Sequence, residues 1–142
     1  MAIHFQLVSA TGVKFDDEAY EVLVPTKDGQ IAVFEDHMPL LSAGMPGVLS
    51  IRKQASDVDR EMEHFAVYGG VLEVDGKNAR FVTEDVTAAD EVSEQEAHEA
   101  LARARRLVEA AGNRQALHEA QTVLHHQSAK LHLAQLKRRH HH

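Results

Sequence analysis

The sequence has no cysteine and no tryptophan, and it has only three prolines, five Phe and two Tyr residues. Without cysteine there can be no disulfide, no thiolate metal site and no cysteine nucleophile. No apolar run approaches the roughly 18 residues of a membrane-spanning helix, and the start Met-Ala-Ile-His-Phe has no basic stretch before an apolar one. We therefore expect a protein that stays in the cytoplasm, does not insert into a membrane and draws any chemistry from His, carboxylates, hydroxyls or Lys.

The charge of the chain is unevenly distributed. Its 142 residues carry a net charge of -7, yet residues 1–89 have seven Lys or Arg against fifteen Asp or Glu, and residues 100–142 have eight against two. The two ends therefore face different partners. Nucleic acid is a poor candidate for the basic end, because no Phe or Tyr follows Phe81 to interleave with the basic residues. An acidic protein surface fits at least as well.

The first 89 residues show the pattern of short strands. Apolar residues alternate with polar ones in several short runs, and turn signals recur about every 8 to 12 residues, as in an all-β sandwich or barrel. The turn signals are Thr11-Gly12, Lys27-Asp28-Gly29, Gly44, Pro46-Gly47, Gly69-Gly70 and Asp75-Gly76. The clearest predicted hairpin joins residues 71–74 to residues 79–82 through Asp75-Gly76.

After Asp90 the apolar period changes to about 3.5 residues, which indicates helices. Ser93 and Glu96 form a plausible capping box, Gly112 should end the first helix, and Asn113 should cap the second. We call the line along which the two helices should pack on each other the seam. Its predicted residues are Ala97, Leu101, Ala104, Val108 and Ala111 on the first helix, and Leu117, Ala120, Leu124, Leu131 and Ala134 on the second.

The predicted fold is thus α+β, with an N-terminal antiparallel β-sandwich (1–89) and a C-terminal antiparallel helical hairpin (90–139). Residues 140–142, all His, are interpreted as a tag remnant. Each Ala in the seam buries about three carbons fewer than Leu would, at roughly 0.8 kcal/mol per CH₂. The free energy needed to separate the hairpin from its packing partner should therefore be small. We expect more than one resting place for it, one of them against its own sandwich.

Several apparent chemical motifs fail on inspection. The segment from Gly70 to Asn78 resembles a phosphate-binding loop but has one residue too many between its glycines and no Ser or Thr after Lys77. His118-Glu119 begins like a metalloprotease helix, yet Thr122 stands in place of the second His. We predict no catalytic site, no metal site and no cofactor.

The histidines of the second helix recur every seven residues, at His118, His125 and His132. Neighbouring members are roughly 10 Å apart at 1.5 Å per residue, which is too far to share one metal ion. A solvated or hairpin-facing stripe is the favoured interpretation, with pH-dependent loosening of the hairpin as an alternative.

Residues 29–41, Gly-Gln-Ile-Ala-Val-Phe-Glu-Asp-His-Met-Pro-Leu-Leu, followed by Gly44 and Gly47, resemble the most recognisable stretch of ATP synthase epsilon subunits. The segment 69–74, Gly-Gly-Val-Leu-Glu-Val, resembles the second signature of that family, and the start of the chain resembles its first strand. The resemblance extends over residues 3–139. It implies a non-catalytic rotor subunit at the cytoplasmic face of the bacterial membrane, bound to the gamma shaft and to the ring of c subunits of a proton-translocating ATP synthase.

The resemblance also assigns roles to particular residues. It implies that Lys27, Asp28, Gln30 and His37 meet the c-ring. It further implies that the hairpin can extend along the shaft toward the catalytic beta and alpha subunits and so inhibit ATP hydrolysis. The basic residues expected to act in that state are Arg103, Arg105, Arg106, Arg114 and Lys130. Without the resemblance, a solvated helix face is the commoner reading of such a charge run.

Some family members bind ATP through an Ile/Leu-Asp-x-x-Arg-Ala motif at the start of the first helix. The aligned residues here include Val92, Ser93 and Glu96, so Ser replaces Asp and Glu replaces Arg. Because a carboxylate repels phosphate, we predict weak or absent ATP binding. The alternatives are a free-standing sandwich that senses a nucleotide or docks another protein, and a small β-fold enzyme, which would need a carboxylate or His with a strongly shifted pKa in a cleft.

Overall fold

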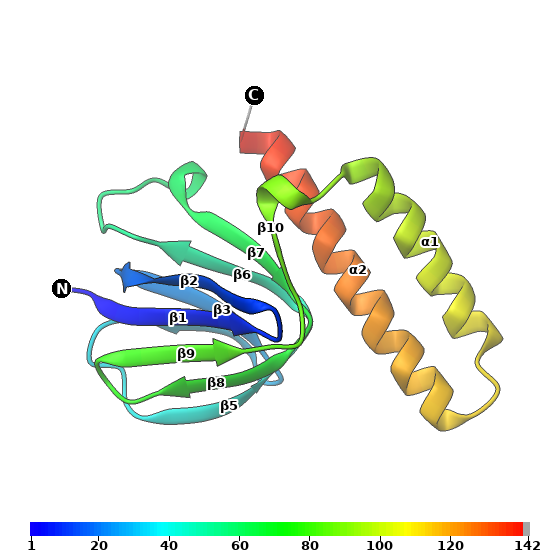
Figure 1. Ribbon diagram of the computed structural model, residues 1–142, viewed down its shortest axis with the longest axis horizontal. Coiled ribbons are helices and arrows are strands. Elements are labelled where there is room, and N and C mark those ends of the chain that lie inside the picture. Colours follow the sequence, from blue (N-terminus) through cyan, green and yellow to red (C-terminus); the bar gives the residue numbers. More distant parts are fainter. Residues whose placement is uncertain (141–142) are drawn as a thin grey trace.

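The structure is a computed structural model that describes residues 1–140. It contains a β-sandwich and a helical hairpin (Figure 1). The strands are β1 (Ile3–Ser9), β2 (Gly12–Ala19), β3 (Glu21–Thr26), β4 (Gly29–Val33), β5 (Leu40–Gly44), β6 (Gly47–Arg52), β7 (Glu63–Val67), β8 (Gly70–Val74), β9 (Asn78–Val82) and β10 (Val86–Ala88). The helices are α1 (Glu94–Ala110) and α2 (Arg114–His140), with short 3₁₀ turns at Asp59–Glu61 and Ala89–Glu91. The fold class predicted from the sequence is confirmed.

The strands form one continuous hydrogen-bonded path that curls into two layers. Its order is β10-β7-β6-β3-β5-β8-β9-β1-β2, with β4 paired to β3 beside that path. All pairs are antiparallel except β1 with β9, which run parallel. Alternate residues of the strands point between the layers, as the burial of every second residue along β1 shows. The core side chains that are fully buried include Phe5, Leu7, Leu49, Ile51, Leu72 and Phe81.

The predicted hairpin at Asp75-Gly76 is confirmed. Strands β8 and β9 are paired antiparallel on either side of it, and the Asn78 amide donates to Oδ1 of Asp75 at 2.8 Å. Gly76 has a φ of 101°, a conformation that favours glycine over residues with a Cβ atom.

The helix caps agree with the sequence pattern. The hydroxyl of Ser93 accepts a hydrogen bond from the Glu96 amide at 3.3 Å, and the side-chain oxygen of Asn113 accepts one from the Ala116 amide at 2.8 Å. The first helix ends at Ala110, two residues before Gly112. Of the three terminal histidines, His140 is the last residue of α2, and His141 and His142 lie outside the described residues.

The predicted seam is partly correct for both helices: Val108, Ala111, Leu124 and Leu131 are only half-buried, and Ala111 lies just beyond the end of α1. Ala97, Leu101 and Ala104 are buried, and on α2 Ala120 and Ala134 are buried too. Leu117 is instead 37% exposed; it lies in the first turn of α2, next to the loop that joins the two helices. Figure 1 shows this end of the hairpin away from the sandwich. The prediction that Leu117 packs in the seam is therefore wrong.

The second helix uses a further face to pack on the sandwich. Ala129 and Leu133 form a small cluster with Ala66 of β7, and α2 contacts both β6 and β7. One predicted resting place of the hairpin, against its own sandwich, is thus present. Within residues 1–140, neither helix is long and apolar enough to cross a membrane.

Candidate functional site

The residues of the altered nucleotide motif lie together. Val92, Ser93 and Glu96 line a cavity of about 330 Å³ beside the start of α1. The charged residues in its lining are Glu91, Glu96, Glu99, Arg103 and Lys130. Three carboxylates against two cations make this cavity a poor match for a triphosphate, which needs an excess of cationic or N–H donors.

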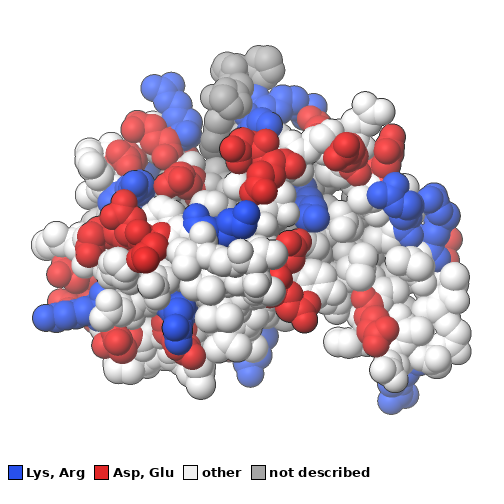
Figure 2. Space-filling view, in the orientation of Figure 1, with Lys and Arg blue, Asp and Glu red and all other residues white. Residues whose placement is uncertain are grey.

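The predicted basic residues do not all share one surface, although Arg103 and Lys130 line the same cavity. Arg103, Arg105 and Arg106 are exposed on α1, where Figure 2 shows a group of Lys and Arg side chains. Arg114 is exposed at the first residue of α2. Lys130 differs from these because it is partly buried and its ammonium lies 3.9 Å from the carboxylate of Asp85.

The four residues expected to meet the c-ring lie at two ends of β4. Lys27 and Asp28 are exposed in the turn before β4, and Gln30 is exposed at its start. The Thr26 hydroxyl orders this turn by donating to the Gly29 carbonyl at 2.7 Å. His37 follows the other end of β4, beside the Asp75-Gly76 turn, where the Asp36 amide donates to the carbonyl of Gly76 at 2.8 Å. The structure therefore separates His37 from the other three.

The predicted histidine stripe faces solvent. His118, His125 and His132 are all exposed on α2. Among the residues that the structure describes, no group of three or more His, Asp or Glu side chains is placed to hold a metal ion.

His126, the most deeply buried histidine within residues 1–139, was not predicted from the sequence. It is 3% exposed and connects α2 to the sandwich. Its Nε2 lies 3.1 Å from Oδ2 of Asp85 and its Nδ1 lies 3.4 Å from the carbonyl oxygen of Val67. The sequence did contain a signal for this contact, because residues 126, 129 and 133 have the spacing of one helix face. The signal is weak because a histidine is polar and interrupts the apolar pattern by which a buried face is recognised.

The layer formed by β5, β8, β9, β1 and β2 carries a row of exposed and half-buried apolar side chains on its outer face. The row crosses five paired strands in register and consists of Ala43, Val71, Val82, Val8 and Val13. The valines of β8, β9 and β2 are 41%, 40% and 58% exposed. The neighbouring row is polar and includes the ion pair of Arg80 with Glu73 at 3.1 Å. An apolar row with a charged border is typical of a protein contact.

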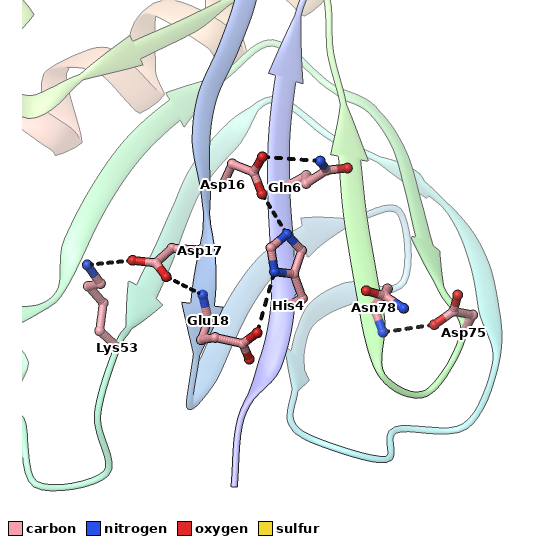
Figure 3. Close-up of polar contacts among 8 residues, drawn as sticks. All are labelled: His4, Gln6, Asp16, Asp17, Glu18, Lys53, Asp75 and Asn78. Atoms are coloured by element: carbon pink, nitrogen blue, oxygen red, sulfur yellow. Dashed lines mark hydrogen bonds and ion pairs between the residues drawn. The ribbon is translucent and has the colours of Figure 1, made fainter.

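The same outer face carries a cluster of hydrogen-bonded charges (Figure 3). His4 on β1 points between two carboxylates of β2, with Nε2 2.5 Å from Asp16 and Nδ1 3.5 Å from Glu18. The hydrogen bond to Asp16 raises the pKa of His4 above its ordinary value. On the opposite side of β2, the pKa of Asp17 is lowered, because its carboxylate accepts from the Glu18 amide and pairs with Lys53.

Comparison with known proteins identifies the family. A sequence model described as "ATP synthase, Delta/Epsilon chain, beta-sandwich domain" matches residues 2–89. An ATP synthase epsilon chain of Gloeobacter violaceus is 32% identical over 134 residues, which cover 94% of this chain and 98% of that relative. A second epsilon chain, from Chloroflexus aggregans, is 36% identical over 73% of this chain and 71% of its own length.

Solved structures share the fold. A chain of the Euglena gracilis mitochondrial ATP synthase, in a structure of its OSCP, F1 and c-ring, superposes with a TM-score of 0.76 at 15% identity, covering 90% of this chain and 78% of that one. A chain from the central stalk and c-ring of the Tetrahymena thermophila enzyme gives a TM-score of 0.53 at 16% identity, covering 64% and 69%. On the strength of the sequence matches, the chain belongs to the epsilon-chain family of ATP synthases.

Proposed function

We propose that this chain is a non-catalytic rotor subunit of a proton-translocating ATP synthase, peripheral to the cytoplasmic face of a bacterial membrane. In this role the sandwich joins the gamma subunit to the c-ring, and the helical hairpin restrains ATP hydrolysis. Family membership supports the assembly, and the two similar structures come from ATP synthase assemblies that include a c-ring.

The restraining role depends on one observation, the small contact between hairpin and sandwich. The buried apolar part of that contact is Ala66, Ala129 and Leu133, and two of these three side chains are single methyl groups. Val48, Ala89 and Val92 are half-buried around them. At about 25 cal/mol per Å² of buried apolar area, such a patch holds the helices with only a few kcal/mol. The hairpin can therefore leave the sandwich at modest cost while the sandwich keeps its own core.

The released hairpin would present its basic side chains to the catalytic beta and alpha subunits. Arg103, Arg105 and Arg106 are already exposed, whereas Lys130 would first have to leave Asp85. Opposite charges across such a contact orient docking more than they add affinity.

The sandwich offers a different surface to each of its proposed partners. The apolar row on its outer face suits the gamma subunit, because a permanent contact needs a water-excluding centre. The exposed turn with Lys27, Asp28 and Gln30 suits the polar loops of the c-ring, and His37 would belong to a separate contact.

Truncation tests this function. Deleting residues 90–142 should raise the ATP hydrolysis rate of the assembled enzyme several-fold, because the deletion removes the restraint and leaves the rotor contacts intact. A full-length chain with Leu107→Ala, an exposed residue of α1, serves as the control and should keep the wild-type rate. An unchanged rate in the truncated enzyme, with the chain still present in the complex, would contradict the restraining role.

The carboxylates in the cavity beside α1 predict weak ATP binding. Isothermal titration of the isolated chain with ATP should show no binding in the micromolar range, because Glu96 faces the cavity where the family motif has Arg. Glu96→Arg should strengthen binding measurably, and Glu109→Arg, on the exposed far end of α1, is the matched control. Micromolar binding by the unaltered chain would favour the nucleotide-sensing alternative.

A further inference from the structure

His126 forms a polar contact between the two parts of the molecule. Its ring is buried where α2 crosses the end of β7, with the Tyr68 ring edge-on at a centroid distance of 4.9 Å. One ring nitrogen faces the Asp85 carboxylate and the other faces the Val67 carbonyl. Both partners belong to the sandwich, so this contact exists only while the hairpin is docked.

The charges around this ring are few and come from each neighbouring element. Among the described residues, Asp85, between β9 and β10, supplies the carboxylate in contact with it, and Tyr68 supplies a phenol just after β7. Lys130, one turn along α2, lies 3.9 Å from the same Oδ2 of Asp85 that His126 contacts. On α1, Arg103 lines a cavity together with Lys130.

A neutral ring carries a single N–H, and its donation to Asp85 at 3.1 Å leaves the 3.4 Å approach to the Val67 carbonyl without a hydrogen bond. Two features nevertheless oppose a second proton on the ring, namely its burial and the nearby Lys130. A protonated His126 would share one half-exposed carboxylate with Lys130, and like charges four residues apart on a helix repel each other. Burial away from water opposes the charged form more strongly than Asp85 favours it, and the pKa of His126 is lowered. The ring would regain its ordinary pKa of about 6.5 once released into water.

The sign of the linkage follows from these two states. A group whose pKa is lower in the docked state contributes its full stabilisation of docking above the pKa of the released state. That contribution is lost as the pH falls, because the released ring takes up a proton more readily than the docked ring does. Acid therefore favours release.

We propose that His126 and Asp85 form a proton-sensitive latch, through which acidification releases the helical hairpin from the sandwich. The latch deepens the proposed function and rests on its premise that the hairpin can leave the sandwich. It would make hairpin release respond to the acidity around the enzyme. One proton per release allows the ratio of docked to released chains to change by at most about tenfold per pH unit.

Energy transfer between two dyes on the isolated full-length chain tests the latch. Because the chain has no cysteine, Ala55→Cys in the loop after β6 and Gln121→Cys on the exposed face of α2 give two specific labelling sites. We expect the docked fraction to fall between about pH 8 and about pH 5.5, the range in which His titrates. His126→Gln should remove most of this dependence, since the amide can still donate to Asp85 but does not titrate. His125→Gln, an exposed neighbour, should leave the dependence unchanged.

A second variant keeps the latch testable if the His126→Gln chain does not fold. Asp85→Asn keeps an acceptor for the ring but removes the counter-charge, so the acid-induced release should become larger. A docked fraction that is flat with pH, that rises in acid, or that keeps its slope in His126→Gln would overturn the latch. The ATPase test of the truncated enzyme is independent: an unchanged rate there with acid-induced release here rejects the restraint alone, and the reverse result rejects the latch alone.

Discussion

The sandwich and the hairpin are built on very different cores. Seventeen buried hydrophobic residues form the main cluster of the sandwich, including three phenylalanines that are at most 6% exposed, whereas the cluster between hairpin and sandwich has three buried members. The helices meet each other largely through alanines. The sandwich can therefore fold on its own contacts, and the hairpin is held by a contact weak enough to be regulated.

The largest expected effect lies in the sandwich core. Phe81 is fully buried, and its ring packs so tightly on Gly44 that a Cβ there would lie 2.4 Å from the ring. Phe81→Ala should lower the free energy of unfolding by about 3–5 kcal/mol, because it removes a large side chain and leaves a cavity. Urea unfolding followed by circular dichroism measures this loss. Val82→Ala, on the exposed face of the same strand, should cost far less, and equal losses would contradict the assignment of the core.

A smaller and more local effect is expected at the hairpin contact. Leu133 is fully buried against Ala66, and Leu133→Ala should weaken docking by about 2–3 kcal/mol. Native-state hydrogen exchange should show faster exchange in α1 and α2 with little change in the strands. The exposed Leu107→Ala is the control. If the strands lost as much protection from hydrogen exchange as the helices, the sandwich and the hairpin would unfold as one cooperative unit. The proposed difference in stability between the two regions would then be wrong.

The difference between the two regions also decided what the sequence could predict. Strand alternation and the turn at Asp75-Gly76 are local signals, and they gave the sandwich correctly. The caps at Ser93 and Asn113 are local too, and they placed both helix starts. The seam prediction was right where helix packs on helix, as at Leu101.

The misses concern contacts between elements far apart in the chain. The face of α2 that meets the sandwich has His126 at its centre, and no local pattern shows that a histidine will be buried against residue 85, forty-one positions away. Likewise, His37 and Lys27 are close in sequence, yet the strand β4 runs between them and separates them in space. Such outcomes depend on the packing of the whole fold and not on any local period.

The smallest expected effect compares two histidines, one in each region. His4 is 39% exposed on the sandwich, and its hydrogen bond with Asp16 raises its pKa, whereas burial lowers the pKa of His126. The raised pKa of His4 stabilises the sandwich below its unfolded value of about 6.5, and this contribution disappears as the pH rises through the folded pKa. Because the pair is exposed, the gain in stability is small.

Proton NMR titration should place the pKa of His4 above the ordinary value, and Asp16→Asn should move it back toward that value. Titration of His4 at or below the ordinary value would remove the contrast. If both shifts hold, the same drop in pH tightens the sandwich slightly and loosens the hairpin, so acid widens the difference in stability between the two regions.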